Sequence, residues 1–166
     1  MGRIMRTLFI IPLVLMSLVS FPSWGLTMDD LVKREEIYYK KFTDVPFNGE
    51  VDEGQTRVLI KNGKMQGNFE RYHDNGQLML RGYIKNDELD GASEYYNENG
   101  QLLSKVNFKN SRKEGGAEHY HDNGQLSQRG NYKNDKMEGF WEGYNEDGTV
   151  DTEYTGTFKN GVKVSD

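Results

Sequence analysis

A block of 24 residues recurs along most of this chain, and this repeat constrains the fold more than any other feature of the sequence. The stretch Tyr-His-Asp-Asn-Gly-Gln-Leu stands at 72–78 and again at 120–126. The spacing runs without insertions until Phe158-Lys159-Asn160, which arrives two residues late. A fixed period of this size predicts a repeat architecture, in which small supersecondary units stack on their neighbours.

The repeated unit has the pattern of a β-hairpin. Two short segments rich in Tyr, Leu and Phe flank an Asn-Gly pair, which is a strong hairpin signal because both residues tolerate positive φ. A second turn is expected at each Lys-Asn pair, and a glycine opens each unit at Gly67, Gly91, Gly115 and Gly139. The turn glycines are Gly76, Gly100, Gly124 and Gly148. The chain is therefore predicted to be all-β, an elongated antiparallel meander of hairpins.

The register of the hairpin follows from its apolar residues. A loop of Asn-Gly alone would put Tyr72 and Leu78 on opposite faces, whereas a loop of Asp74-Asn75-Gly76 puts them across from each other on one face. We therefore predict the three-residue loop, with its glycine in the left-handed conformation. Leu78, Leu80, Gly82 and Ile84 are then expected to share the face of Tyr72.

The first 25 residues differ from the rest. Arg3 and Arg6 precede an apolar run from Leu8 to Val19, and Ser23 and Gly25 are small residues where a signal peptidase reads. An apolar core of about a dozen residues is short for a bilayer that needs about 20. This pattern predicts a secretory signal cleaved between Gly25 and Leu26, an exported protein in the periplasm or outside the cell, and no stable membrane insertion afterwards.

Charge and cysteine content narrow the class of partner. Residues 1–25 carry two arginines and no acid, so without them the formal charge changes from −5 to −7. Nucleic acids and anionic lipids are bound chiefly through excess Lys and Arg, so neither is expected as the main partner. The chain has no Cys, hence no disulfide.

The repeat unit resembles a known pattern. Gly, four residues, Tyr, two or three residues, Asn-Gly-Gln-Leu and then aromatic-Lys-Asn is similar to the MORN repeat variant (membrane occupation and recognition nexus). More narrowly, it resembles the bacterial YwqK-like family, catalogued as antitoxin components of toxin-antitoxin systems. The opening segment Leu31 to Val51, with Pro46-Phe47 and Gly49, resembles that family too. The resemblance covers roughly residues 30–161 and implies a curved MORN-like meander with two strands per repeat.

The sequence offers little chemistry. His73, His119 and His121 are the three histidines, and His119 and His121 flank Tyr120 on a strand, where they are expected on a solvated face. The stretch Asn145 to Asp151 partly fits a calcium loop, but Gly143 and Tyr154 would then occupy positions that need a carboxylate. Its phase with the other Asn-Gly turns explains it better. No nucleophile, metal or cofactor site is predicted, and the chain is not expected to be an enzyme.

One polar feature is regular. A glutamate stands two residues before each repeat tyrosine and on the same face. A solvated row of glutamates with neighbouring Arg or Lys is one interpretation, and an acidic and aromatic stripe that binds a cationic or sugar-like partner is the other. These candidate binding or structural positions are Glu70, Tyr72, Glu94, Tyr96, Glu118, Tyr120, Glu142 and Tyr144.

The expected organisation has four parts. A signal peptide spans 1–25, and a lead-in at 26–46 holds a short N-terminal helix capped by Thr27 and an opening strand that covers one edge of the sheet. The MORN-like repeat domain spans 47–161. Residues 162–166 form a short, frayed C-terminal tail.

Three functions are compatible with this organisation. The first is an exported, non-catalytic interaction module for a protein partner that the sequence does not identify. The second is an antitoxin or immunity component that neutralises a co-encoded toxin, although an exported chain would not meet a toxin of the cytosol. The third is a surface that binds cell-wall carbohydrate through exposed Tyr72, Tyr96, Tyr120 and Tyr144.

Overall fold

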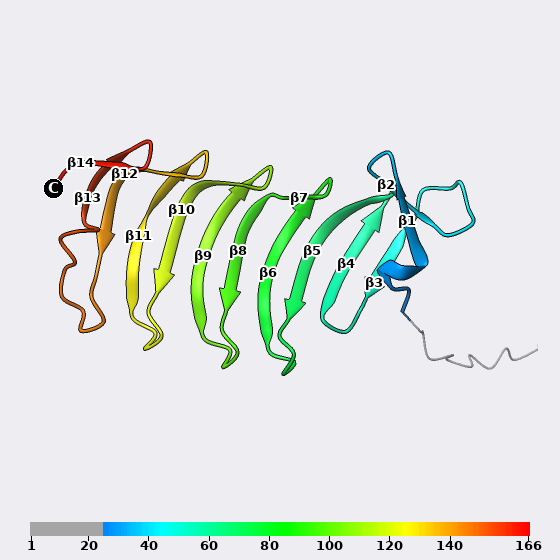
Figure 1. The fold of residues 1–166 in the computed structure, drawn as a ribbon, viewed down its shortest axis with the longest axis horizontal. Helices are drawn as coiled ribbons and strands as arrows, with labels where there is room; N and C mark the ends of the chain where they lie inside the picture. Colours follow the sequence, from blue (N-terminus) through cyan, green and yellow to red (C-terminus); the bar gives the residue numbers. More distant parts are fainter. Residues whose placement is uncertain (1–24) are drawn as a thin grey trace, which may run out of the picture.

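The computed structural model describes residues 25–166, and the predicted signal segment lies outside them apart from Gly25. One long antiparallel sheet forms most of the molecule, and its strands follow the chain order side by side along the long axis (Figure 1). The predicted all-β meander is confirmed. The strands of this sheet are β3 (Gly49–Asp52), β4 (Thr56–Lys61), β5 (Lys64–Tyr72), β6 (Leu78–Lys85), β7 (Glu88–Leu89), β8 (Gly91–Tyr96), β9 (Leu102–Lys109), β10 (Arg112–Tyr120), β11 (Leu126–Lys133), β12 (Lys136–Gly143), β13 (Gly156–Lys159) and β14 (Val162–Ser165).

The Asn-Gly turn has the predicted three-residue loop. Tyr72 on β5 pairs with Leu78 on β6, the His73 N–H donates to the Gln77 carbonyl (2.8 Å), and the Gly76 N–H donates to the His73 carbonyl (2.9 Å). Gly76 has a φ of +83°, a left-handed conformation that glycine adopts without steric cost. The next two hairpins repeat these bonds and this register.

The face assigned to the second strand is wrong beyond Leu78. Tyr72 pairs with Leu78, but Arg71 pairs with Leu80, so Met79 is an extra residue in a β-bulge. The bulge reverses the alternation, because cross-strand partners share a face. Leu80, Gly82 and Ile84 therefore lie on the face opposite Tyr72.

The Lys-Asn turns are two-residue turns with both central residues at positive φ, the geometry that suits a tight hairpin. Asn110 and Ser111, with φ of 50° and 59°, join β9 to β10 in this way. Each turn is also tied to the preceding repeat: the Asp135 N–H donates to the Lys113 carbonyl (3.1 Å), and the Lys113 N–H donates to Asp135 Oδ1 (2.8 Å).

The unit-opening glycines lie opposite the large residues of the following strand. Gly67 pairs with Ile84 and Gly91 with Phe108. The next two units repeat this arrangement with Gly115 and Tyr132, and with Gly139 and Phe158. Positive φ at each of these glycines indicates a local bulge in the strand.

The apolar side chains form two clusters. The N-terminal cluster gathers Leu31, Phe47, Val51, Val58, Ile60 and Ile84. The C-terminal cluster gathers Val106, Ala117, Trp141 and Phe158. Trp141 is fully buried, and its ring fills the space above Gly130, where a Cβ would overlap the indole. Its Nε1 donates to the Asn131 carbonyl at 3.0 Å.

The lead-in differs from the prediction. The expected helix is one 3-10 turn, η1 (Met28–Asp30), in which the Asp30 carboxylate accepts from the N–H and hydroxyl of Thr27. β1 (Leu31–Arg34) and β2 (Ile37–Lys40) form a separate two-stranded sheet, so the opening strand does not cover an edge. The residue that pairs with the edge strand β3 is Leu26, through a parallel bridge to Val51.

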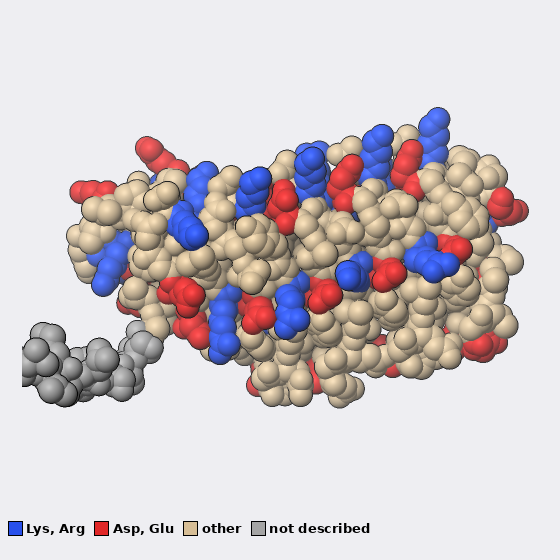
Figure 2. Space-filling model, turned by 180° about the vertical axis from the view of Figure 1, so that it is seen from behind, with Lys and Arg blue, Asp and Glu red and all other residues tan. Residues whose placement is uncertain are grey.

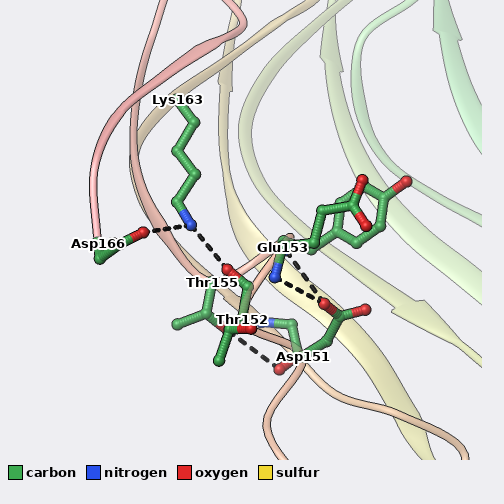
Figure 3. Close-up of polar contacts among 8 residues, drawn as sticks. Asp151, Thr152, Glu153, Thr155, Lys163 and Asp166 are labelled. Carbon is green, nitrogen blue, oxygen red and sulfur yellow. Dashed lines mark hydrogen bonds and ion pairs between the residues drawn. The ribbon is translucent and has the colours of Figure 1, made fainter.

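The C-terminal tail is also not frayed. Val162–Ser165 form β14, because the Asn160-Gly161 turn has the same two-residue geometry as the earlier Lys-Asn turns. Figure 3 shows how the longer connection between β12 and β13 is organised: Asp151 Oδ1 accepts from the Glu153 N–H (2.9 Å), and Lys163 Nζ donates to the Thr152 carbonyl (2.7 Å).

Candidate functional site

The repeated glutamates lie in a ladder of alternating charges. Arg81 on β6 stands directly between Glu70 on β5 and Glu94 on β8, and Lys105 and Arg129 take the same place between later glutamates. We call the surface that carries this row the ladder face; Figure 2 shows it as a line of alternating blue and red side chains across the molecule. In strand order the row is Asp52, Arg57, Glu70, Arg81, Glu94, Lys105, Glu118, Arg129 and Glu142.

Several rungs of the ladder are ion pairs. Arg81 Nε lies 3.2 Å from Glu70 Oε1, Lys105 Nζ lies 3.8 Å from Glu94 Oε1, and Arg129 pairs with Glu142. Each exposed pair contributes at most about 1 kcal/mol to stability. Their larger effect is on register, since a strand shifted by one residue would break the charge alternation along the sheet.

The repeat tyrosines bond to these glutamates. The hydroxyl of Tyr72 donates to Glu70 (2.6 Å), and those of Tyr96, Tyr120 and Tyr144 donate to the glutamate two residues before (2.8, 2.8 and 3.4 Å). All four tyrosines are half-buried. The structure therefore brings the predicted pairs together, but it does not present the tyrosine rings as freely exposed platforms.

The hydrogen bonds shift two carboxyl pKa values downward. The Tyr72 hydroxyl, and after it Arg81, lowers the pKa of Glu70, because both stabilise the carboxylate. The guanidinium of Arg129 lowers the pKa of Glu142 in the same way. These carboxylates stay ionised at neutral pH, which keeps the ladder charged.

The sequence contained a signal for the missing half of the ladder. Arg57, Arg81, Lys105 and Arg129 are spaced by 24 residues, like the glutamates. The prediction from the sequence included the spacing of the glutamates but not that of these cations.

His119 is not on a solvated face, contrary to the prediction, and all three histidines are half-buried. His119 packs against Trp141 in a stacked arrangement and against Tyr132 edge-on, and burial lowers its pKa. His121 and His73 contact the carbonyls of Tyr144 (2.7 Å) and Tyr96 (2.9 Å) in the following repeat. Each histidine thus has a structural partner, and the described residues contain no group of three or more His, Cys, Asp or Glu that could hold a metal.

The stretch from Asn145 to Asp151 begins with a hairpin turn of the repeat type. The Asn145 N–H donates to the Thr149 carbonyl (2.8 Å) and the Gly148 N–H donates to the Asn145 carbonyl (2.9 Å), as in the other Asn-Gly loops. Asp147 accepts from the N–H and the hydroxyl of Thr149. Its carboxylate is thereby used within the turn.

The ladder face carries a hollow of about 520 Å³ between β9 and β12, and a smaller one of about 370 Å³ beside Asn68 at β3 to β5. Gly116 forms the floor of the larger hollow, with Asn107 and Asn131 on either side and Phe140 beyond. Gly116, Asn68, Ala92 and Phe140 occupy the same position of successive repeats. At this position Gly116 leaves the floor of the larger hollow without a side chain, and the phenylalanine of the next repeat borders it. Sequence reasoning missed this hollow, since it followed the constant positions.

A second unusual feature lies in the lead-in. Phe42 is fully exposed and has a φ of +65°, which is rare for an aromatic residue. Arg34 fixes this loop, donating to the Thr43 carbonyl (2.6 Å) and to Asp44 Oδ1 (2.9 Å) while its guanidinium lies over the Tyr39 ring. Val45 nearby is 71% exposed. The loop projects from the end of the molecule near β1 and β2 (Figure 1).

Comparison with known proteins agrees with the hairpin units. The family model of the MORN repeat variant matches residues 65–86, 89–110 and 113–134, and each match spans two strands joined by an Asn-Gly loop. These three hairpin units are thus similar to MORN repeat variants. Repeats of this kind generally mediate protein or membrane interactions and are generally non-catalytic.

The Phe42 loop and the hollow both extend outside the three matched repeats. The Phe42 loop lies before the first matched repeat, and the hollow spans the second and third matched repeats and β12, which follows them. Between residues 25 and 166, no helix is long and apolar enough to cross a membrane.

Two further comparisons add nothing to the functional argument. No curated protein matches the chain. A chain in the crystal structure of a GtfA/B complex bound to UDP and GlcNAc aligns with 15% identity and a TM-score of 0.37, over 76% of this chain and 26% of that chain. This chain thus spans about a quarter of the length of that one.

Proposed function

We propose that this chain is an exported, non-catalytic module that binds a protein partner, with Phe42 as the anchor of the contact. The observation that supports this proposal is the exposure of Phe42 in a left-handed backbone conformation. Leaving a phenylalanine side chain in water forgoes about 1.5–3 kcal/mol of burial energy. The left-handed backbone costs a further 1–2 kcal/mol or so.

The contacts around Phe42 support a role for this residue in binding. Arg34 holds the loop through two hydrogen bonds, so the ring is presented in one place before any partner arrives. Preorganisation reduces the entropy lost on binding. Exposed aromatic residues that enter a pocket of the partner are typical of the few positions that carry most of a binding energy. The repeat sheet would then serve as a rigid support.

The first experiment replaces Phe42 with a photoreactive phenylalanine analogue in the native host and identifies what becomes cross-linked. The expected result is one cross-linked protein from the cell envelope. An excess of wild-type protein without the analogue should compete for the partner and suppress this cross-link. Affinity of the purified partner is then measured for Phe42→Asn, since asparagine tolerates positive φ. We expect at least about a tenfold loss of affinity, as for other aromatic anchors.

The same substitution separates binding from folding. Phe42→Asn should raise the free energy of unfolding by roughly 0.5–1 kcal/mol, because it relieves backbone strain. Val162→Asn, at an exposed apolar residue of β14, is the matched control and should leave affinity unchanged. If Phe42→Asn binds the partner as tightly as the wild type, the proposal is wrong.

The narrower resemblance to the YwqK-like family gives a second experiment. An antitoxin should relieve the lethality of a toxic neighbour when both proteins are placed in the same compartment. Export itself is tested by N-terminal sequencing of the mature protein, which we expect to begin at Leu26.

A further inference from the structure

We propose that the hollow over Gly116 is a binding site for a neutral oligosaccharide. This inference is independent of the proposed protein partner, because it concerns a different region of the molecule. The volume of the hollow is within the range of small-molecule sites. The chemistry of its walls decides which class of ligand it would take.

The walls combine one aromatic ring with several hydrogen-bonding groups. Phe140 is 54% exposed, so its ring is available to the apolar C–H face of a sugar. Asn107 Nδ2 donates to the Gly116 carbonyl (2.9 Å), which fixes that amide, and the amide oxygen is an acceptor for a ligand hydroxyl. Asn131 is exposed on the opposite side of the floor. An aromatic surface with a few fixed polar groups is the usual composition of a small-ligand site.

The charges around the hollow favour a ligand without net charge. Lys105, Glu118, Arg129 and Glu142 line it, two cations and two anions. Arg129 is already paired with Glu142, and Glu118 accepts from the Tyr120 hydroxyl (2.8 Å). Such a rim offers donors and acceptors to hydroxyl groups but no excess charge for a phosphate or a polyuronate.

The position of the hollow within the repeats supports a specific role. The repeats share their turns, ladder and tyrosines, whereas this position holds a different residue in each unit and combines an open glycine with a phenylalanine only at Gly116 and Phe140. A Cβ at Gly116 would meet only the amides of Asn107 and Asn131, at 3.6 and 3.9 Å. Packing therefore does not require glycine here, and its φ does not lie in the left-handed region.

The experiment titrates the purified protein with chitotetraose, cellotetraose and maltotetraose, and with trigalacturonate as the anionic comparison, by calorimetry and by NMR. We expect saturable binding of at least one neutral tetraose and none of trigalacturonate. Because no net charge is involved, tenfold more salt should change the affinity by less than about twofold.

Two substitutions localise the binding. Gly116→Tyr fills the hollow and Phe140→Ala removes the ring. Each should reduce the affinity for the neutral tetraose by about tenfold or more. Ala92→Tyr adds the same bulk at the equivalent position of the preceding repeat, and should change affinity by less than about twofold. Circular dichroism and thermal melting establish that each variant is folded.

Three outcomes would overturn the inference. These are the absence of saturable binding by every neutral tetraose, binding of trigalacturonate alone, and full affinity in Gly116→Tyr. None of them bears on the Phe42 anchor, whose cross-linking and affinity measurements use a protein partner.

Discussion

The two faces of the sheet differ in what they hold constant from repeat to repeat. On the ladder face, the glutamate and the tyrosine recur in four successive units, and the cation recurs between them. On the opposite, core face, paired positions change from Val58 and Phe69 to Val106 and Ala117. The constant residues of the ladder face set strand register through hydrogen bonds and charge, and the core face fills space by matching large residues to small ones.

The largest contrast between the faces is expected at two adjacent residues of β12. Trp141→Ala should reduce the free energy of unfolding by about 3–5 kcal/mol, because it empties the space over Gly130. Phe140→Ala, on the ladder face, should cost less than about 1 kcal/mol, since half of that side chain is already in water. Chemical denaturation of both variants measures the difference, and similar losses would contradict it.

The next contrast separates a glycine that the backbone needs from one that it does not. Gly124 has a φ of +85° in the Asn-Gly turn, so Gly124→Ala should destabilise by about 1–2 kcal/mol. Gly116→Ala should change stability by less than about 0.5 kcal/mol, because the chain there is an ordinary strand with room for a Cβ. Thermal melting compares the two, and the idea fails if the order is reversed.

The ladder itself predicts a smaller effect. Lys105→Glu would place a third carboxylate between Glu94 and Glu118, and two like-charge contacts should cost about 0.5–1 kcal/mol in total. Because the groups are exposed, the loss should shrink as salt is raised. Lys109→Glu, at the exposed last residue of β9 and outside the ladder, is the control with the same change of net charge. Equal losses in both variants would argue against the ladder.

The faces should also respond to different ranges of pH. Burial lowers the pKa of His119, so the unfolded state binds more protons below its ordinary value of 6.5, and stability falls as the pH drops through that value. The pKa of Glu70 is lowered from 4.5, so its contribution is present above pH 4.5 and is lost on further acidification. His119→Phe should weaken the pH dependence of the free energy of unfolding near pH 6.5, and Tyr72→Phe should weaken it below pH 4.5. Denaturation at a series of pH values measures both effects. A variant that flattens both ranges equally would contradict this division.

The repeat spacing and the Asn-Gly chemistry were sufficient to predict the fold, the three-residue loop and the Tyr72–Leu78 register. They were insufficient beyond Leu78, because the bulge at Met79 has no sequence signal as strong as a glycine. The partners of Glu70 and Glu94 could have been predicted, since Arg81 follows the same period. The separate sheet of β1 and β2 and the exposure of Phe42 depend on tertiary contacts outside the repeats. The hollow at Gly116 could not be predicted from the sequence, because it depends on the side chains of the neighbouring strands.

The bonds between neighbouring turns have a mechanical consequence. Asp135 and Lys113 join one repeat to the next, as do His121 and Tyr144, and these links span no more than about one period of the sequence. Tension applied to the two ends of the chain should therefore peel the sheet one hairpin at a time, as a series of small force peaks of similar height, instead of rupturing it in a single event.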